Sequence, residues 1–129
     1  MYFKNLIDFN PIFMKENLIK EESFDYALKA IELYKILIKR KEFILSKQFL
    51  RSSTSIGANV AEATAGFSKR DFIYKMGIAS KEARESFYWI RLIEASALVD
   101  YDFKSLKEDA QKLIRILTSI VKTAQSSLK

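Results

Sequence analysis

The stretch of sequence that decides the fold runs from Leu45 to Ala95 and reads LSKQFLRSSTSIGANVAEATAGFSKRDFIYKMGIASKEARESFYWIRLIEA. Apolar residues recur in it at helical spacing on both sides of Gly66, and Gly is the residue preferred just after a helix end. Ser68, followed three residues later by Asp71, has the spacing of a capping box and marks a helix start. We therefore expect two helices, over about residues 46–65 and 69–98.

Both of these predicted helices have small residues at their centres. Ser, Gly and Ala occupy most of residues 52–65, and they recur between Gly77 and Ser86. The distance between packed helices depends on the side chains at the contact, so small residues allow a close approach. The sequence thus predicts a tight crossing of the two helices.

One further helix is predicted on each side of this stretch. Upstream, Ser23 is the candidate N-cap of a helix that is closed by the cations of residues 39–41, which suit the negative end of the helix dipole. Downstream, Asp102 is the candidate cap of a last helix over about residues 103–127.

These elements divide the chain into an N-terminal extension, residues 1–22, which is expected to be partly irregular, and a bundle domain, residues 23–129. The connections between the predicted helices are short, and short connections favour antiparallel neighbours. The predicted fold is therefore all-α, an antiparallel up-down-up-down four-helix bundle.

Composition argues against catalysis. The 129 residues include no Cys and no His, so a thiolate nucleophile, the commonest general base and the commonest metal ligand are all missing. We expect a protein that is not an enzyme and has no cofactor and no metal site. The apolar runs are far shorter than the roughly 20 residues that span a bilayer, so no membrane segment is expected. A chain without Cys fits the cytoplasm.

Polar residues of the two central helices form the first candidate site. We interpret them as an internal network of ion pairs and hydrogen bonds that fixes the helix register, because buried charges are usually paired. The alternative is a carboxylate acid/base pair or metal site, although the His ligands of di-iron bundles are missing. The predicted structural polar network consists of Arg51, Ser55, Asn59, Glu62, Lys81, Glu82 and Glu85.

Clustered cations form the second candidate site. The chain has 22 Lys and Arg against 16 Asp and Glu, a net charge of +6 that makes it a basic protein. Lys and Arg neutralise phosphates, so such clusters predict contacts with nucleic acid, whereas the alternative is a solvated face. The candidate nucleic-acid-binding residues are Lys35, Lys39, Arg40, Lys41, Lys69, Arg70 and Lys75.

Apolar side chains are more abundant than one slim bundle readily buries. Hydrophobic residues make up 49% of the chain, including ten Phe, six Tyr and one Trp. Surplus apolar surface favours self-association, so we expect a homo-oligomer.

The central stretch resembles the signature of a known family, the four-helix bundle protein family, also called the 23S rRNA intervening-sequence protein family. An Arg-Ser run followed by SIGAN and Glu falls on residues 51–62, Ser-Lys-x-Asp-Phe falls on residues 68–72, and Ile-Ala-x-Lys-Glu-Ala falls on residues 78–83, with Trp89 following. The resemblance extends from about Met14 into the last predicted helix. It departs from the family pattern before Met14 and at Ser53, where many relatives carry Gly.

The resemblance implies an antiparallel four-helix bundle that assembles as a homopentamer with a central channel. Some family members are encoded within intervening sequences of bacterial 23S rRNA genes. A related protein, the accessory variability protein of diversity-generating retroelements, is a basic pentamer that binds reverse transcriptase and nucleic acid. No catalytic residues are defined for the family. We therefore expect a bacterial protein that binds RNA or another nucleic acid; the alternative is an oligomeric protein-interaction scaffold without nucleic-acid binding.

Overall fold

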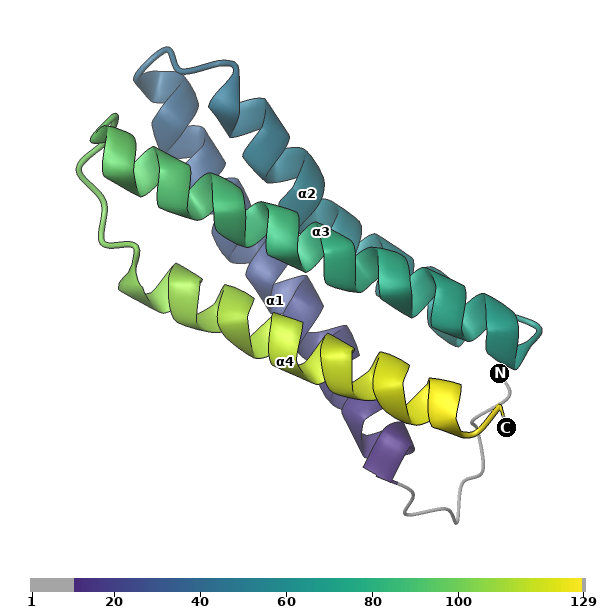
Figure 1. Ribbon diagram of the computed structural model, residues 1–129. Helices are drawn as coiled ribbons and strands as arrows, with labels where there is room; N and C mark the ends of the chain where they lie inside the picture. The colour runs from purple at the N-terminus through teal and green to yellow at the C-terminus, as the bar shows by residue number, and fades with distance from the viewer. Residues whose placement is uncertain (1–10, 129) are drawn as a thin grey trace.

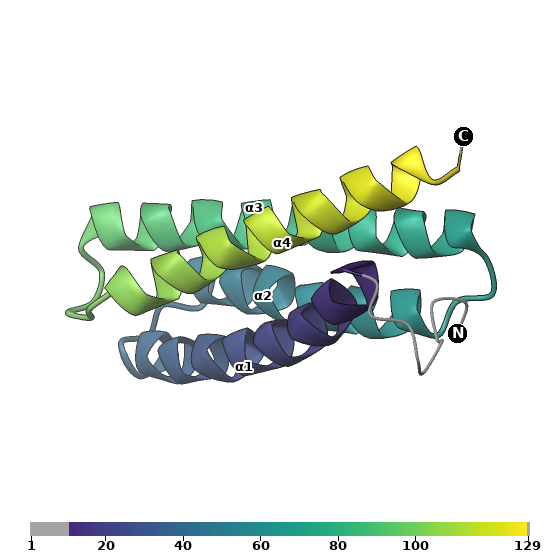
Figure 2. The ribbon, with the colours of Figure 1, turned by 90° about the horizontal axis from the view of Figure 1, so that it is seen from below.

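The computed structural model describes residues 11–128, which form four helices and no strand (Figure 1). The helices are α1 (Pro11–Lys39), α2 (Leu45–Thr64), α3 (Lys69–Ser96) and α4 (Lys104–Ser126). Both α1 and α3 pack against α2 and α4. The helices thus form a ring around one core (Figure 2), and the prediction of an all-α four-helix bundle is confirmed.

Ion pairs across two of the helix pairs run in opposite chain directions. Between α2 and α3, Arg51 pairs with Glu82, whereas Glu62, further along α2, pairs with Lys75, earlier in α3. Between α1 and α4 the pairs are Glu22–Lys112 and Lys29–Asp109. Since the residue number rises on one helix as it falls on the other, the two members of each pair are antiparallel.

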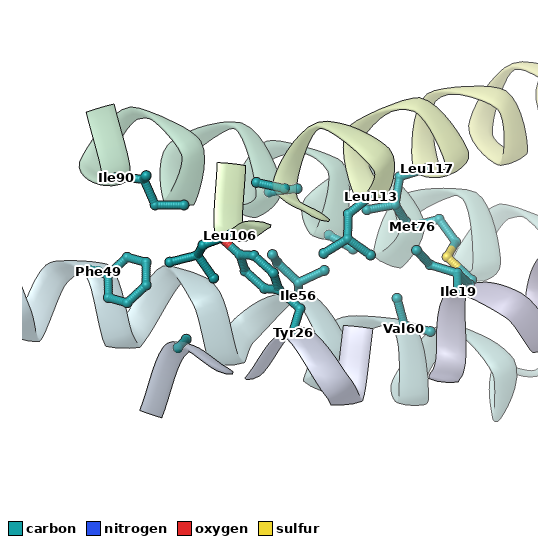
Figure 3. Close-up of a cluster of buried hydrophobic side chains, with 14 of the residues drawn as sticks. Ile19, Tyr26, Phe49, Ile56, Val60, Met76, Ile90, Leu106, Leu113 and Leu117 are labelled. Carbon is teal, nitrogen blue, oxygen red and sulfur yellow. The ribbon is translucent and has the colours of Figure 1, made fainter. Parts of the chain in front are cut away.

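The core receives fully buried side chains from all four helices, and each buried Leu, Ile, Phe or Met contributes about 1.5–3 kcal/mol. Figure 3 shows part of this cluster, including Ile19, Tyr26, Phe49, Ile56, Met76, Ile90, Leu113 and Leu117. None of the described helices has the length and apolarity of a membrane span.

The start of α1 differs from the prediction. α1 begins at Pro11, so residues 11–22 are helical where the sequence suggested an irregular extension. Pro suits the first helical turn because the N–H that it lacks would have no partner in the helix there. Ser23, the predicted N-cap, is instead buried in the middle of α1. The rest of the predicted extension, residues 1–10, lies outside the described residues.

The other three helices begin and end within two residues of the predicted positions. The Ser68 hydroxyl accepts a hydrogen bond from the Asp71 N–H at 3.1 Å, which confirms the predicted cap of α3. Asp102 Oδ1 accepts from the N–H of Lys104 at 3.1 Å, so this carboxylate also serves the start of its helix, although Phe103 holds the N-cap position.

α2 and α3 share the most extensive contact of any helix pair, as their small centres predicted. The two Gly residues near those centres do not contribute to this contact. A Cβ on Gly57 would meet the Ser23 hydroxyl of α1 at 3.4 Å, whereas a Cβ on Gly77 would meet nothing within 4 Å. The small residues that are buried in α2 and α3 are Ser46, Ser52, Ser53, Ala63, Ala79, Ala83 and Ser86.

Candidate nucleic-acid interface

Arg51 forms the centre of the predicted polar network. Its guanidinium donates from Nη1 to Glu82 at 2.9 Å and from Nη2 to Glu85, so one Arg of α2 joins two carboxylates of α3. Trp89 Nε1 donates to the same Glu85 carboxylate at 3.0 Å. Partial burial works against the charge, but the two carboxylates raise the pKa of Arg51 above its ordinary value. This cluster links α2 to α3, as expected for a residue set that fixes register.

Ser55, Asn59 and Glu62, which were also predicted to belong to the network, do not contact the Arg51 guanidinium. Ser55 and Asn59 hydrogen-bond to backbone carbonyls of α2, one turn before each of them. Glu62 forms a separate ion pair with Lys75 at 2.9 Å, and this hydrogen bond and charge raise the pKa of Lys75. The side chains of Arg51 and Glu62 are 48% and 61% exposed, so the network lies on the surface and is not internal.

A buried chain of hydroxyl groups, which the sequence analysis missed, crosses the core instead. The Tyr26 hydroxyl lies 2.6 Å from Ser86 Oγ, which lies 2.7 Å from Ser53 Oγ. Burial raises the pKa of Tyr26 despite these hydrogen bonds. The only signal in the sequence is a Tyr on an apolar stripe and one Ser at a core position of each central helix. The chain connects α1, α2 and α3 at one level of the bundle.

The predicted cation clusters lie at opposite ends of the bundle (Figure 1). Lys39, Arg40 and Lys41 precede α2, whereas Lys69 and Arg70 follow it, and the 20 residues of α2 span about 30 Å. The clusters therefore do not share one surface.

Three of the seven predicted cations are already engaged. Lys35 pairs with Glu32 at 3.5 Å, Lys75 pairs with Glu62, and Lys69 donates to the backbone carbonyl of Ser127 at 3.3 Å.

A third group of cations lies along α3 and α4, and only Lys81 among them was singled out from the sequence. Three hollows of about 380, 490 and 450 Å³ follow one another between these two helices and form what we call the α3–α4 groove. Seven cationic and two acidic side chains line it, an excess of five positive charges. They are Lys81, Arg84, Arg91, Lys104, Lys107, Arg115 and Lys122, with Glu94 and Glu108.

Most cations of the α3–α4 groove lack an acidic partner within residues 11–128. The exception is Lys107, which pairs with Glu94 at 2.8 Å. Arg84 Nη2 instead donates to the Thr118 hydroxyl at 3.0 Å, which holds the guanidinium across the groove. The contrast with the α2–α3 surface is clear, because there Arg51 and Lys75 are both neutralised by carboxylates.

Helical periodicity explains why these cations share one groove. Arg84 and Arg91 are seven residues apart on α3, and Arg115 and Lys122 are seven apart on α4. Seven residues make close to two turns, so each pair lies on one side of its helix, about 10 Å apart along the axis. No group of acidic side chains in the described part of the chain is placed to hold a metal ion. The arrangement therefore provides positive charge and hydrogen-bond donors for an elongated anion.

Comparison with known proteins identifies related sequences and structures. A family model described as 23S rRNA-intervening sequence protein matches residues 15–119. A crystal structure of a protein of unknown function from the S23 ribosomal protein family of Bacteroides thetaiotaomicron is 42% identical to this chain, with a TM-score of 0.80. The similarity covers 84% of this chain and 98% of that one. A search of curated proteins finds no match.

Proposed function

This chain belongs to the 23S rRNA-intervening sequence protein family, and we propose that it is a non-enzymatic, cytoplasmic protein that binds RNA through the α3–α4 groove. The observation that carries the proposal is the excess of five positive charges along that groove. An anion as long as the groove gains the most binding free energy from cations that are not already neutralised by carboxylates. Nucleic acid is such an anion, because its phosphates form a long row of negative charges. Each phosphate that a Lys or Arg neutralises releases condensed counterions, which favours binding.

The salt dependence of binding tests this proposal. Five phosphate contacts to a single strand give a slope of about −3.5 in log K against log salt, so affinity should fall about 100-fold between about 50 and 200 mM salt. The measurement is fluorescence anisotropy of a labelled single-stranded RNA. Affinity that does not change over this salt range would contradict phosphate binding.

Two triple variants distinguish the groove from the predicted cluster at the end of α1, Lys39, Arg40 and Lys41, which we call the end cluster. Arg84→Gln, Arg115→Gln and Lys122→Gln together should weaken RNA binding and reduce the salt slope by about 2, since each lost contact removes about 0.7. Lys39→Gln, Arg40→Gln and Lys41→Gln remove the same charge at the end of α1. If only this second triple variant loses affinity, the interface is the end cluster and not the groove.

Self-association is the second part of the proposal, and it is supported by apolar side chains on the α1–α2 side. Phe24 and Leu28 are 65% and 51% exposed, and Met14 is also exposed on α1. Beside Phe24, a hollow of about 280 Å³ is lined by small residues of α2, among them Gly57 and Ala61. Exposed apolar surface of this kind marks protein contacts. We propose that up-down-up-down bundles assemble through it as a homopentamer.

Multi-angle light scattering tests the assembly. The wild-type protein should elute at five times the protomer mass, and Phe24→Ser should shift the mass towards the monomer. A wild-type monomer at micromolar concentration would contradict the pentamer. The alternative function, an oligomeric protein-interaction scaffold, would be favoured by a stable pentamer that binds no RNA.

A further inference from the structure

The middle of the α3–α4 groove differs from the rest of it because an aromatic ring contributes to its lining. Phe87 lines both the 490 Å³ hollow and the neighbouring 450 Å³ hollow, and it packs against the buried core on its other side. It is the only aromatic residue that lines the groove within residues 11–128. Phosphate binding alone would need no aromatic surface at this point.

Polar groups surround Phe87 at the edges of these hollows. Gln111 of α4 lines the same two hollows, and its amide can both donate and accept hydrogen bonds. Arg84 and Arg115 line the larger hollow, one from each helix. An apolar surface with an amide and two guanidinium groups around it combines the features that recognise a planar base next to its phosphates.

We propose that the α3–α4 groove takes a strand with an unpaired base and that this base stacks on Phe87. Base stacking on aromatic side chains supports binding to single strands and tolerates any base, because every base has a π-face. Gln111 faces the edge of the base, and the two Arg side chains meet the flanking phosphates. This inference rests on the proposed function, to which it adds the class of ligand: single-stranded nucleic acid, either RNA or DNA.

The volume of the hollow fits this assignment. At about 490 Å³ it falls within the range of small-molecule sites, roughly 300–1,000 Å³, which leaves room for one base and part of its sugar. The groove continues on both sides through hollows of about 450 and 380 Å³. A strand can therefore extend in both directions from the stacked base along further cations.

The experiment compares three fluorescent strands of about 12 nucleotides, within the usual range of site sizes for single-strand binders. One is oligouridylate RNA, one is oligothymidylate DNA, and one is an abasic strand that keeps the phosphates but has no bases. The wild-type protein should bind the two base-bearing strands about tenfold more tightly than the abasic strand. The tighter of the two base-bearing strands identifies RNA or DNA as the ligand.

Phe87→Leu is the informative variant, because Leu keeps apolar packing against the core and removes the flat ring. It should bind all three strands with the affinity that the wild type has for the abasic strand. Tyr88→Leu is the matched control, since Tyr88 is the next residue, is exposed and lines none of the hollows. The control variant should keep the tenfold preference. Circular dichroism and thermal unfolding establish that both variants are folded.

Each result separates this inference from the proposed function. Equal affinity of the wild type for all three strands would overturn base stacking and leave phosphate binding intact. An equal loss of affinity for all three strands in Phe87→Leu would also overturn it. The abasic strand has no base to stack, so the ring would then affect binding only by supporting the structure of the groove. If none of the strands binds, both the inference and the proposed function fail.

Discussion

The buried hydroxyl chain makes a prediction about stability whose sign can be worked out from the structure. Tyr26 is 1% exposed, and its hydroxyl has Ser86 Oγ as its partner at 2.6 Å. Replacing Ser86 with Ala removes the central member and the 2.6 Å partner of the buried Tyr26 hydroxyl. Leaving a buried polar group unsatisfied costs about 1–3 kcal/mol, and the lost hydrogen bond between Ser86 and Ser53 adds about 1 kcal/mol. We expect Ser86→Ala to lower the free energy of unfolding by about 2–4 kcal/mol.

Removing the Tyr26 hydroxyl first changes this outcome. In Tyr26→Phe, Ser86 keeps its bond with Ser53 at 2.7 Å, so the loss should be only about 1 kcal/mol. In the double variant no Tyr hydroxyl is left unsatisfied, and Ser53 can turn to a carbonyl of its own helix. The double variant should therefore be more stable than Ser86→Ala alone, by about 1–2 kcal/mol. A second substitution that restores stability is the signature of an orphaned polar group.

Urea denaturation followed by far-UV circular dichroism, at one fixed protein concentration, measures the four free energies of the double-mutant cycle. Ser52→Ala is the matched control. Ser52 is as fully buried as its neighbour Ser53, but its hydroxyl donates only to carbonyls of α2, at 3.1 Å. Its loss orphans no donor and should cost less than about 0.5 kcal/mol. Additive losses in the Tyr26 and Ser86 variants would refute the reasoning.

Three further changes test features of the helices. Lys41 has a left-handed backbone conformation with φ 63°, which costs any residue other than Gly about 1 kcal/mol. Lys41→Gly should therefore raise the urea midpoint, whereas Lys41→Ala should not. Gly77 lies inside α3 with open space around it, so Gly77→Ala should raise the free energy of unfolding by about 0.5–1 kcal/mol, and a loss would mean that the groove closes on this position. At Glu42, burial would raise the pKa, but N–H groups at the start of α2 lower it, the Ser46 N–H at 2.7 Å among them. Because the folded pKa is the lower one, Glu42 stabilises the protein above its unfolded pKa and loses this effect as pH falls through the folded pKa. Glu42→Gln should therefore reduce stability at pH 7 and flatten the acid limb of a stability–pH profile; an unchanged acid limb would exclude this contribution.

The helical architecture followed from the sequence because apolar periodicity and caps act locally. The start of α3 was correct because Ser68 and Asp71 are only three residues apart and need no tertiary partner. The start of α1 was wrong because Pro11 and Ser23 each have two local interpretations. Ser is a common N-cap residue, so the local sequence around Ser23 indicates a helix start. Its place inside α1 follows from its contact with Gly57 of α2, and these two residues are far apart in the chain.

The candidate site was harder to predict because charge pairing depends on which helix faces which. The sequence indicated a polar network that includes Arg51, Glu82 and Glu85 but not which charges pair, and the structure pairs Arg51 with both carboxylates. The sequence left open how the cation cluster that precedes α2 and the cluster that follows it lie relative to each other, because that depends on how the helices pack. The α3–α4 groove was missed because its cations are evenly spread along the sequence and become a row only when two helices lie side by side.

The distribution of charge around α3 connects these observations. Its acidic residues Glu82 and Glu85 face α2, where Arg51 neutralises them, whereas Arg84 and Arg91 face α4, on the other side of the same helix. Between these two sides, the buried Ser86 is tied to α1 and α2 through the hydroxyl chain and fixes the rotation of α3. A rotation of α3 by one residue, about 100°, would turn its cations away from α4 and out of the groove. The buried hydroxyl chain therefore matters for more than stability, because it ties α3 to α1 and α2 in the rotation that turns Arg84 and Arg91 towards α4.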